Sequence, residues 1–443
     1  MNWLNSLNKS IPDIKKISSI SNPSHLIKLV GEFGIGSPPS HTIPHITSTS
    51  NNSSTGSTHV TYDELYHSAL HRSKPLAING RYTNPFSTWR EPSWSQVMKW
   101  HKQRKQTDLN KLQPPAVHEY IDHTQYKYNY RAFDQQLPIV KPDTHKLHNP
   151  SSAQNEIQYT WLGHATLLIQ HNGLNILIDP HFTQRAAPLS FLGPQRYRDL
   201  PCRVSELPPI HIVCVSHNHY DHLDYTSIKQ LIQHSNHHNT DTKFYVPLGI
   251  DRWMKRWTSV HKNNVIGLDW WHTYNNDSRT LHDIADHRNI TSDITPSSYR
   301  ITSVPAQHWS QRTFFDRNIT LWCGFVIELG SYKLYYSGDT GLNPSLQQIQ
   351  NQFTTIDCCI LPIGAYIPEW FMHYQHIAPD QAVYIHKLLK SKYSIAIHFG
   401  TFDLADESYC DAPTELHKSC DSDGVDRSKF LIPVHGHTNT IQL

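Results

Sequence analysis

The segment from Ser216 to Asp224, SHNHYDHLD, places three histidines and two aspartates directly after the apolar run HIVCV. His217 and His219 alternate, so both can face one metal ion in a tight loop, while Asp221 and His222 can face a second ion. Zinc binds imidazole nitrogen and carboxylate oxygen, and each ion needs its own ligands. A solvated histidine-rich loop is the simpler alternative in a chain with 33 histidines, but H-x-H-x-D-H after an apolar strand is a specific pattern and predicts a two-metal site.

Three later apolar runs each end in a further candidate ligand. His308 follows ITSVPAQ, Asp339 follows LYYSG and His398 follows SIAI. A carboxylate such as Asp339 can bridge two cations, whereas Asp179, at the end of LNILID, is expected to hold a ligand histidine in place. Two metal ions about 3.5–4 Å apart can activate water and polarise a phosphate oxygen. The residues therefore predict a metal-dependent hydrolase.

These side chains need strands that end together. From about residue 157, short apolar runs such as KFYVP, KLYYS and DCCILP alternate with helix patterns such as TSIKQLIQH and LNPSLQQIQNQF. A further helix is expected to begin at Pro379 and Asp380, because proline is favoured in the first turn. Strands that are apolar on both faces, with helices between them, indicate an α/β protein whose sheets are covered by helices. The polar segments 234–242 and 272–297 are expected to be surface insertions.

Composition narrows the class of protein. The 443 residues carry a net charge of +2, which gives no basic surface for nucleic acid, and no apolar run approaches the eighteen residues of a membrane span. Cys214, Cys323, Cys358 and Cys359 lie in apolar runs, so we expect buried thiols and an intracellular location.

The N-terminal region differs in composition from the rest. Residues 34–59 are rich in Ser, Thr, Pro, Gly and Asn and cannot form a core. We therefore expect residues 1–75 to be a disordered or loosely structured extension and residues 76–443 to form the catalytic domain.

The chain resembles the metallo-β-lactamase superfamily, whose marks are H-x-H-x-D-H with a downstream His, Asp and His. The stretches TWLGHATLLIQ, LGPQRYRDLPC, SHNHYDHLDY, QHWSQRT, GDTG and PIGAYIPEWFMHYQHIAPDQAVYIH are similar to one branch, the N-acylphosphatidylethanolamine-hydrolysing phospholipases D. They occur in order between about residues 157 and 403.

This resemblance implies an αββα sandwich of two mixed sheets with helices outside. It implies two zinc ions per chain, one on His217, His219 and His308, the other on Asp221, His222 and His398, with Asp339 bridging both. It places Asp221, Asp339 and His376 in catalysis and Tyr220 and His376 against the substrate. A homodimer is also implied.

The activity implied is hydrolysis of N-acylphosphatidylethanolamine to N-acylethanolamine and phosphatidate by a cytoplasmic enzyme in peripheral contact with a membrane surface. Trp309, Phe314, Phe315 and Trp370 flank the ligand segments and suit an apolar groove or a membrane interface. One alternative is a hydrolase of a soluble phosphodiester or lactone. Another is an inactive metal-binding scaffold, which the complete ligand set argues against.

Overall fold

The computed structural model describes residues 72–106, 137–283 and 298–443, except 190, 192, 197 and 409. All of them belong to one compact unit, His59–Leu443. The expected loose extension over residues 1–75 therefore lies, apart from its last four residues, outside the described part of the chain.

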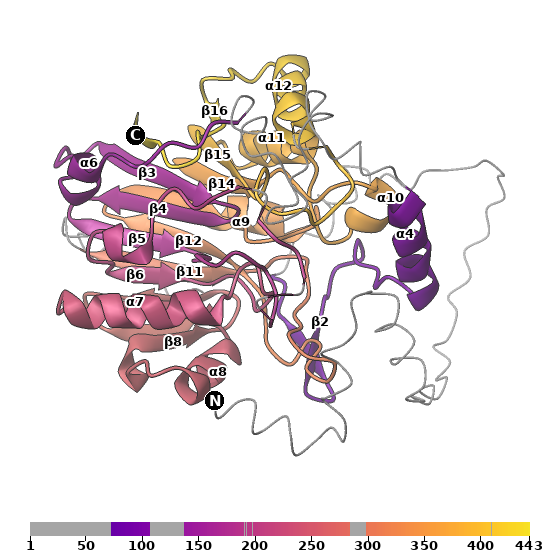
Figure 1. Cartoon of the computed structure of the whole chain (residues 1–443), viewed down its shortest axis with the longest axis horizontal. Coiled ribbons are helices and arrows are strands. Elements are labelled where there is room, and N and C mark those ends of the chain that lie inside the picture. Colours follow the sequence, from indigo (N-terminus) through magenta and orange to yellow (C-terminus); the bar gives the residue numbers. More distant parts are fainter. Residues whose placement is uncertain are drawn as a thin grey trace. The chain divides into compact units, whose positions relative to one another are not determined.

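Two mixed sheets form the centre of this unit (Figure 1). The first has the order β17-β3-β4-β5-β6-β7-β8, with β3 (Glu156–Gly163), β4 (Thr166–His171), β5 (Leu174–Ile178), β6 (Ile212–Cys214), β7 (Lys243–Pro247), β8 (Val265–Leu268) and β17 (Thr438–Gln442). The second has the order β10-β9-β11-β12-β13-β14-β15-β16, with β9 (His272–Asn275), β10 (Thr280–Asp283), β11 (Tyr299–Val304), β12 (Gly324–Leu329), β13 (Tyr332–Tyr336), β14 (Cys358–Pro362), β15 (Tyr393–Ile397) and β16 (Phe430–Leu431). Each sheet changes from antiparallel to parallel pairing partway across, at β5 in the first and at β13 in the second.

Strand β5 shows how the sequence builds the layers. Ile176 and Ile178 belong to the core shared with the second sheet, while Leu177 belongs to the core under the helices α7 (Tyr225–His237) and α8 (Ile250–Trp257). Successive side chains of a strand point to opposite faces, so an uninterrupted apolar run is buried on both sides. Burying each such side chain contributes about 1.5–3 kcal/mol.

The second sheet is covered in the same way. α11 (Pro379–Leu388) packs on β14 and contacts α9 (Ser345–Phe353) and α12 (Asp411–Asp423). Proline occupies the first turn of α11, as expected. The arrangement of helices outside two facing sheets confirms the αββα expectation.

Smaller elements lie around this frame. They are the hairpin β1 (Leu76–Ile78) and β2 (Arg81–Thr83), the helices α4 (Trp94–Gln106), α6 (Thr144–His148) and α10 (Glu369–Met372), and the 3-10 turns Val204–Glu206 and Lys262–Asn264. None of the helices in the described ranges is long and apolar enough to cross a membrane.

The expectation that residues 272–297 form a surface insertion was wrong for residues 272–283. They form β9 and β10, which extend the second sheet beyond β11. Thr273 is buried and shares a 2.8 Å hydroxyl hydrogen bond with Thr302 of β11, so polar residues stabilise this edge. Residues 284–297 lie outside the described ranges. The segment expected as an insertion at 234–242 begins inside α7, which continues to His237.

Candidate metal centre

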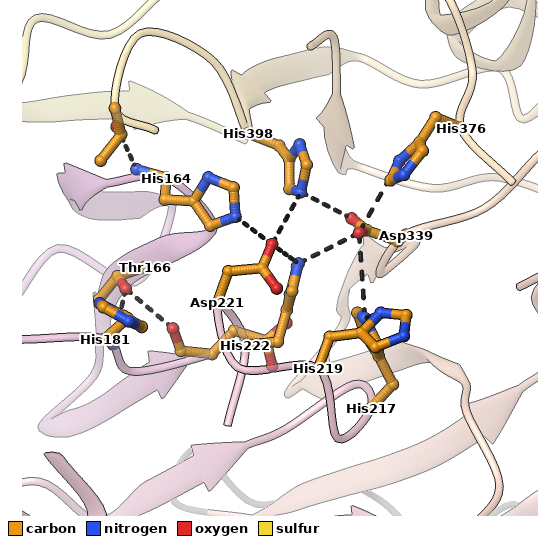
Figure 2. Close-up of polar contacts among 12 residues, drawn as sticks. His164, Thr166, His181, His217, His219, Asp221, His222, Asp339, His376 and His398 are labelled. Atoms are coloured by element: carbon orange, nitrogen blue, oxygen red, sulfur yellow. Dashed lines mark hydrogen bonds and ion pairs between the residues drawn. The ribbon is translucent and has the colours of Figure 1, made fainter. Parts of the chain in front are cut away.

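The predicted ligands meet at one edge of the two sheets. β6 is followed by the segment 215–224, called here the β6 loop, which ends at Asp224, the N-cap of α7. His308 follows β11, Asp339 follows β13 and His398 follows β15. β11, β13 and β15 run in the same direction, so their carboxyl ends lie together and bring side chains far apart in sequence to one place (Figure 2).

Three imidazoles form the first candidate ligand set. His217 Nε2 lies 2.8 Å from His219 Nδ1, and His308 Nε2 lies 3.1 Å from the same nitrogen. Tetrahedral zinc with bonds of about 2.0–2.1 Å separates its ligand atoms by roughly 3.3 Å. The three nitrogens are therefore spaced as ligands of a single ion.

The second set combines a carboxylate with two imidazoles. Asp221 Oδ2 lies 3.4 Å from His222 Nε2 and 3.7 Å from His398 Nε2. Asp339 completes the set, with Oδ2 3.1 Å from His222 Nε2 and Oδ1 3.2 Å from His398 Nε2.

Asp339 also faces the first set. Its Oδ2 lies 3.9 Å from both His217 Nε2 and His308 Nε2. The carboxylate thus stands between the two groups of imidazoles, as a bridging ligand would.

Two of the histidine nitrogens at the site are buried without a hydrogen bond to any described residue, which also fits a metal site. His222 Nε2 and His398 Nε2 are buried, and they face the carboxylates of Asp221 and Asp339 without the geometry of a hydrogen bond. Leaving such groups unsatisfied costs free energy, so buried nitrogens that converge with carboxylates are typical of a metal site. Two cations at these positions would satisfy them.

The buried histidines of the site differ in the direction of their pKa shifts. Burial lowers the pKa of His219 to about 4 and that of His308 to about 3, which favours the neutral form that binds metal. Burial also opposes a charge on His398, but Asp339 and Asp221 outweigh it and raise the pKa of His398 to about 9. Burial likewise raises the pKa of Asp339, but His222 and His398 bring it well below the usual carboxyl range. The carboxylates attract positive charge, which metal ions would supply in place of protons.

Asp179 supports ligands from behind, as the sequence indicated. Its Oδ2 accepts hydrogen bonds from His222 Nδ1 at 2.6 Å, from the Ser216 hydroxyl at 2.5 Å and from the Tyr336 hydroxyl. The Ser216 hydroxyl lies 2.9 Å from His217 Nδ1. Asp179 therefore orients a histidine of each ligand set, one directly and one through Ser216.

Three residues at the site have an unusual backbone conformation. His164, Asp179 and His398 have φ values of 52°, 36° and 62°, in the left-handed region that is uncommon for residues other than glycine. Such conformations cost about 1–3 kcal/mol each and persist where the surrounding structure holds them.

Comparisons with known proteins identify the family. Residues 174–399 match the family model described as a β-lactamase superfamily domain. The chain is 35% identical over 291 residues to the Caenorhabditis elegans N-acyl-phosphatidylethanolamine-hydrolyzing phospholipase D 1, covering 65% of this chain and 75% of that protein. It is 30% identical over 394 residues to the mitochondrial N-acyl-phosphatidylethanolamine-hydrolyzing phospholipase D of Saccharomyces cerevisiae, covering 84% and 78%.

The chain belongs to this phospholipase D family of the β-lactamase superfamily. It is a metal-dependent hydrolase. Among solved structures it is similar to Igni18, a metallo hydrolase of the archaeon Ignicoccus hospitalis, with 22% identity, a TM-score of 0.44, and coverage of 65% of this chain and 99% of that one.

A groove of about 620 Å³ lies over the candidate metal-binding side chains. His219, Asp221, His308 and Asp339 form part of its lining, and its other lining residues include Trp94, Trp100, Trp309, Phe371 and Met372. The site is thus a polar, metal-binding floor between apolar walls.

The two residues predicted to touch substrate both line this groove. His376 Nδ1 points toward Asp339, 3.8 Å from Oδ2, and has no hydrogen-bond partner among the described residues (Figure 2). The Tyr220 hydroxyl instead donates to Arg312 O at 2.8 Å, which leaves its ring as the part available to a ligand.

Two residues that the sequence does not reveal also contribute to the site. His164, in the turn between β3 and β4, contacts Asp221, and the carbonyl of Gln375 lies 3.0 Å from His308 Nδ1. The stretch TWLGHATLLIQ contained His164, but a lone histidine carries no ligand spacing. A backbone carbonyl leaves no signal in the sequence at all.

Proposed function

We propose that this protein is a dizinc phosphodiesterase that hydrolyses N-acylphosphatidylethanolamine to N-acylethanolamine and phosphatidate. The observation that carries the proposal is a pair of ligand sets sharing Asp339 at the floor of an apolar groove. His217, His219 and His308 would hold one zinc, and Asp221, His222 and His398 the other.

Zinc ions bound there would supply an activated water and a polarised phosphate oxygen. The chain's own residues then orient the substrate. His376 Nδ1 faces the same space as Asp339 and is free to hydrogen-bond a phosphate oxygen or the leaving oxygen. The Tyr220 ring lines that space from the β6 loop.

The groove walls favour a lipid over a small soluble substrate. Trp100 stacks on Phe371 with ring centroids 5.0 Å apart, and Met372 joins the same apolar cluster. An acyl chain could occupy this side while its phosphate reaches the ligands.

Exposed apolar side chains near the groove support contact with a membrane surface. Phe314 and Phe315 are 77% and 80% exposed, and Trp94 at the start of α4 is 70% exposed. Arg317, two residues beyond Phe315, pairs with Glu91 at 2.7 Å, and both line the groove together with Trp94. Aromatic side chains in such positions suit the boundary between lipid and water.

The charge of α4 suggests which lipids the surface would meet. Its sequence WSQVMKWHKQRKQ contains basic residues and no acidic one, and Lys99 and Lys102 are exposed. A basic helix that also exposes apolar side chains, here Trp94 and Met98, would bind anionic bilayers more strongly than neutral ones. The N-acylated substrate and phosphatidate are themselves anionic.

A substrate panel tests the activity. Purified protein would be offered N-acylphosphatidylethanolamine, phosphatidylethanolamine, phosphatidylcholine, a soluble phosphodiester and a lactone, with products identified by mass spectrometry. We expect N-acylethanolamine and phosphatidate from the first lipid. Preferred turnover of the lactone or soluble diester would favour the alternative hydrolase, and no turnover of any compound by zinc-loaded protein would favour a scaffold.

Vesicle sedimentation tests the membrane contact separately from turnover. Trp94→Ala should bind less to vesicles containing phosphatidate. Trp257→Ala, which removes a 41% exposed tryptophan from α8, is the matched control and should bind like the wild type. If Trp94→Ala bound these vesicles as strongly as Trp257→Ala and the wild type, the proposal that Trp94 contacts the membrane would be wrong. We also propose that the protein associates peripherally with membranes inside the cell. We further propose that it forms a homodimer, which a measurement of its mass in solution would test.

A further inference from the structure

The Arg312 side chain lies between two aromatic rings beside the β6 loop. Its guanidinium carbon is 4.1 Å from the centre of the Tyr220 ring and 5.0 Å from that of Trp253 in α8. Its Nη1 donates two hydrogen bonds, to Asn218 O at 2.8 Å and to Leu223 O at 2.6 Å.

These two carbonyls flank the part of the β6 loop that carries His219, Asp221 and His222. One nitrogen therefore closes this stretch into a loop of fixed width. Tyr220, inside the stretch, returns a hydrogen bond from its hydroxyl to Arg312 O. The loop and Arg312 are thus joined through both side chain and backbone.

Arg312 is itself anchored in the segment that supplies His308. Its backbone N–H and that of Thr313 donate to Asp316 Oδ1 at 2.9 and 2.7 Å. His308 lies four residues earlier and is held by Gln375 O. Because His219 and His308 belong to one ligand set, the distance between these two segments must be maintained for that set to form.

We propose that Arg312 is a positioning residue of the metal centre, which sets the β6 loop against the segment that carries His308. A guanidinium suits this place because its flat face stacks on aromatic rings while its N–H groups remain in the plane for carbonyls. A lysine ammonium offers no planar face and would not keep both contacts. The inference rests on the proposed metal centre but not on the identity of the substrate.

Zinc release tests the inference. Zinc-loaded Arg312→Lys would be mixed with excess chelator, and release followed with a chromophoric indicator. We expect release at least about 10-fold faster than from the wild type, the range seen when outer partners of metal ligands are lost. Tyr220→Phe, which keeps the ring and removes one hydrogen bond, should show a smaller acceleration. Arg256→Lys is the matched control, since Arg256 stacks on Trp257 of the same helix α8, 5.2 Å from its ring centre.

A purely structural role would give a different pattern. It would lower the melting temperature of the metal-free variant and leave zinc release unchanged, and that result for Arg312→Lys would overturn the inference. If Arg312→Lys fails to fold, wild-type release from Tyr220→Phe would overturn it. A wild-type protein that binds no zinc would contradict both this inference and the proposed function.

Discussion

His164 connects Asp221 and His398, two candidate ligands that follow strands of different sheets. Its Nε2 lies 2.9 Å from Asp221 Oδ2, and its backbone carbonyl accepts a 2.9 Å hydrogen bond from the backbone N–H of His398. Its own N–H donates to Thr401 Oγ1 at 2.7 Å. His164 therefore fixes both the side chain of Asp221 and the backbone that carries His398, and it belongs to the support of the second ligand set.

We expect His164→Ala to weaken zinc binding at the second set about 10- to 100-fold, the usual effect of removing a hydrogen-bonding partner of a ligand. Titration of metal-free protein with zinc measures this directly. His171→Ala is a suitable control, because His171 lies in the neighbouring strand β4 and its Nδ1 contacts Glu156 O. Equal zinc affinity for His164→Ala and wild type would refute this role.

The ligand-bearing strands could be predicted because their signals are local. A run such as HIVCV identifies a buried strand, and H-x-H-x-D-H directly after it identifies the loop. Asp179 was assigned to support on the same basis, and the structure places it 2.6 Å from His222 Nδ1. The role of His164 could not be predicted, because it depends on contacts between residues far apart in sequence. Asp221 lies 57 residues after His164, and His398 lies in a different sheet-end segment much later in the chain.

Two elements were missed for related reasons. In α4, Trp100 stacks on Phe371 and Val97 packs against the same apolar cluster, so the apolar contacts of the helix depend on residues far along the chain. In β9, buried threonine and asparagine replace the apolar residues that normally reveal a strand. Both α4 and β9 are therefore stabilised by tertiary contacts that a local sequence pattern does not reveal.

Asp339→Asn should impair both ligand sets, and the second most. The substitution removes a negative charge and one bridging oxygen from a site where Asp339 Oδ1 and Oδ2 face His398 and His222. The zinc content should fall below the two ions per chain expected for the wild type. Turnover should fall by more than about 100-fold, which exceeds the usual effect of removing a residue that only hydrogen-bonds a metal ligand. Asp357→Asn, whose Oδ2 accepts from Lys333 N, should retain both. Wild-type rates in Asp339→Asn would rule out bridging.

His376→Ala should separate metal binding from turnover. His376 lines the groove, and we propose that it contacts substrate rather than zinc. The variant should therefore keep two zinc ions and lose about 10²- to 10⁴-fold in turnover, the range for a residue that transfers or holds a proton. His373→Ala, three residues earlier, removes a side chain whose Nδ1 contacts Glu369 O and should behave as wild type. Loss of zinc from His376→Ala would instead make His376 a ligand.

Acid should destabilise the fold partly through His386, which lies away from the metal centre. Burial lowers the pKa of His386 from 6.5 to about 4, and its Nδ1 lies 2.8 Å from Ser394 Oγ. Between these values the unfolded chain binds a proton that the folded chain does not, so this contribution is complete above pH 6.5 and is lost as the pH falls toward 4. The difference in unfolding free energy between wild type and His386→Gln should shrink by up to about 3 kcal/mol over that range. A difference independent of pH would contradict the assignment.

The bond that breaks can be identified with heavy-oxygen water. Among the described residues that line the groove there is no serine, cysteine or lysine, so the simplest reaction is attack of water on phosphorus. The water oxygen should then enter phosphatidate, while N-acylethanolamine leaves with its own oxygen and takes up a proton. The proposed zinc sets leave His376 as the remaining imidazole in the lining, and a phosphohistidine formed on it would also label phosphatidate. A primary alcohol distinguishes the two, because it would capture the covalent intermediate as phosphatidyl alcohol. We expect little of that product; efficient transfer to the alcohol, or label in the ethanolamide, would exclude direct attack of water on phosphorus.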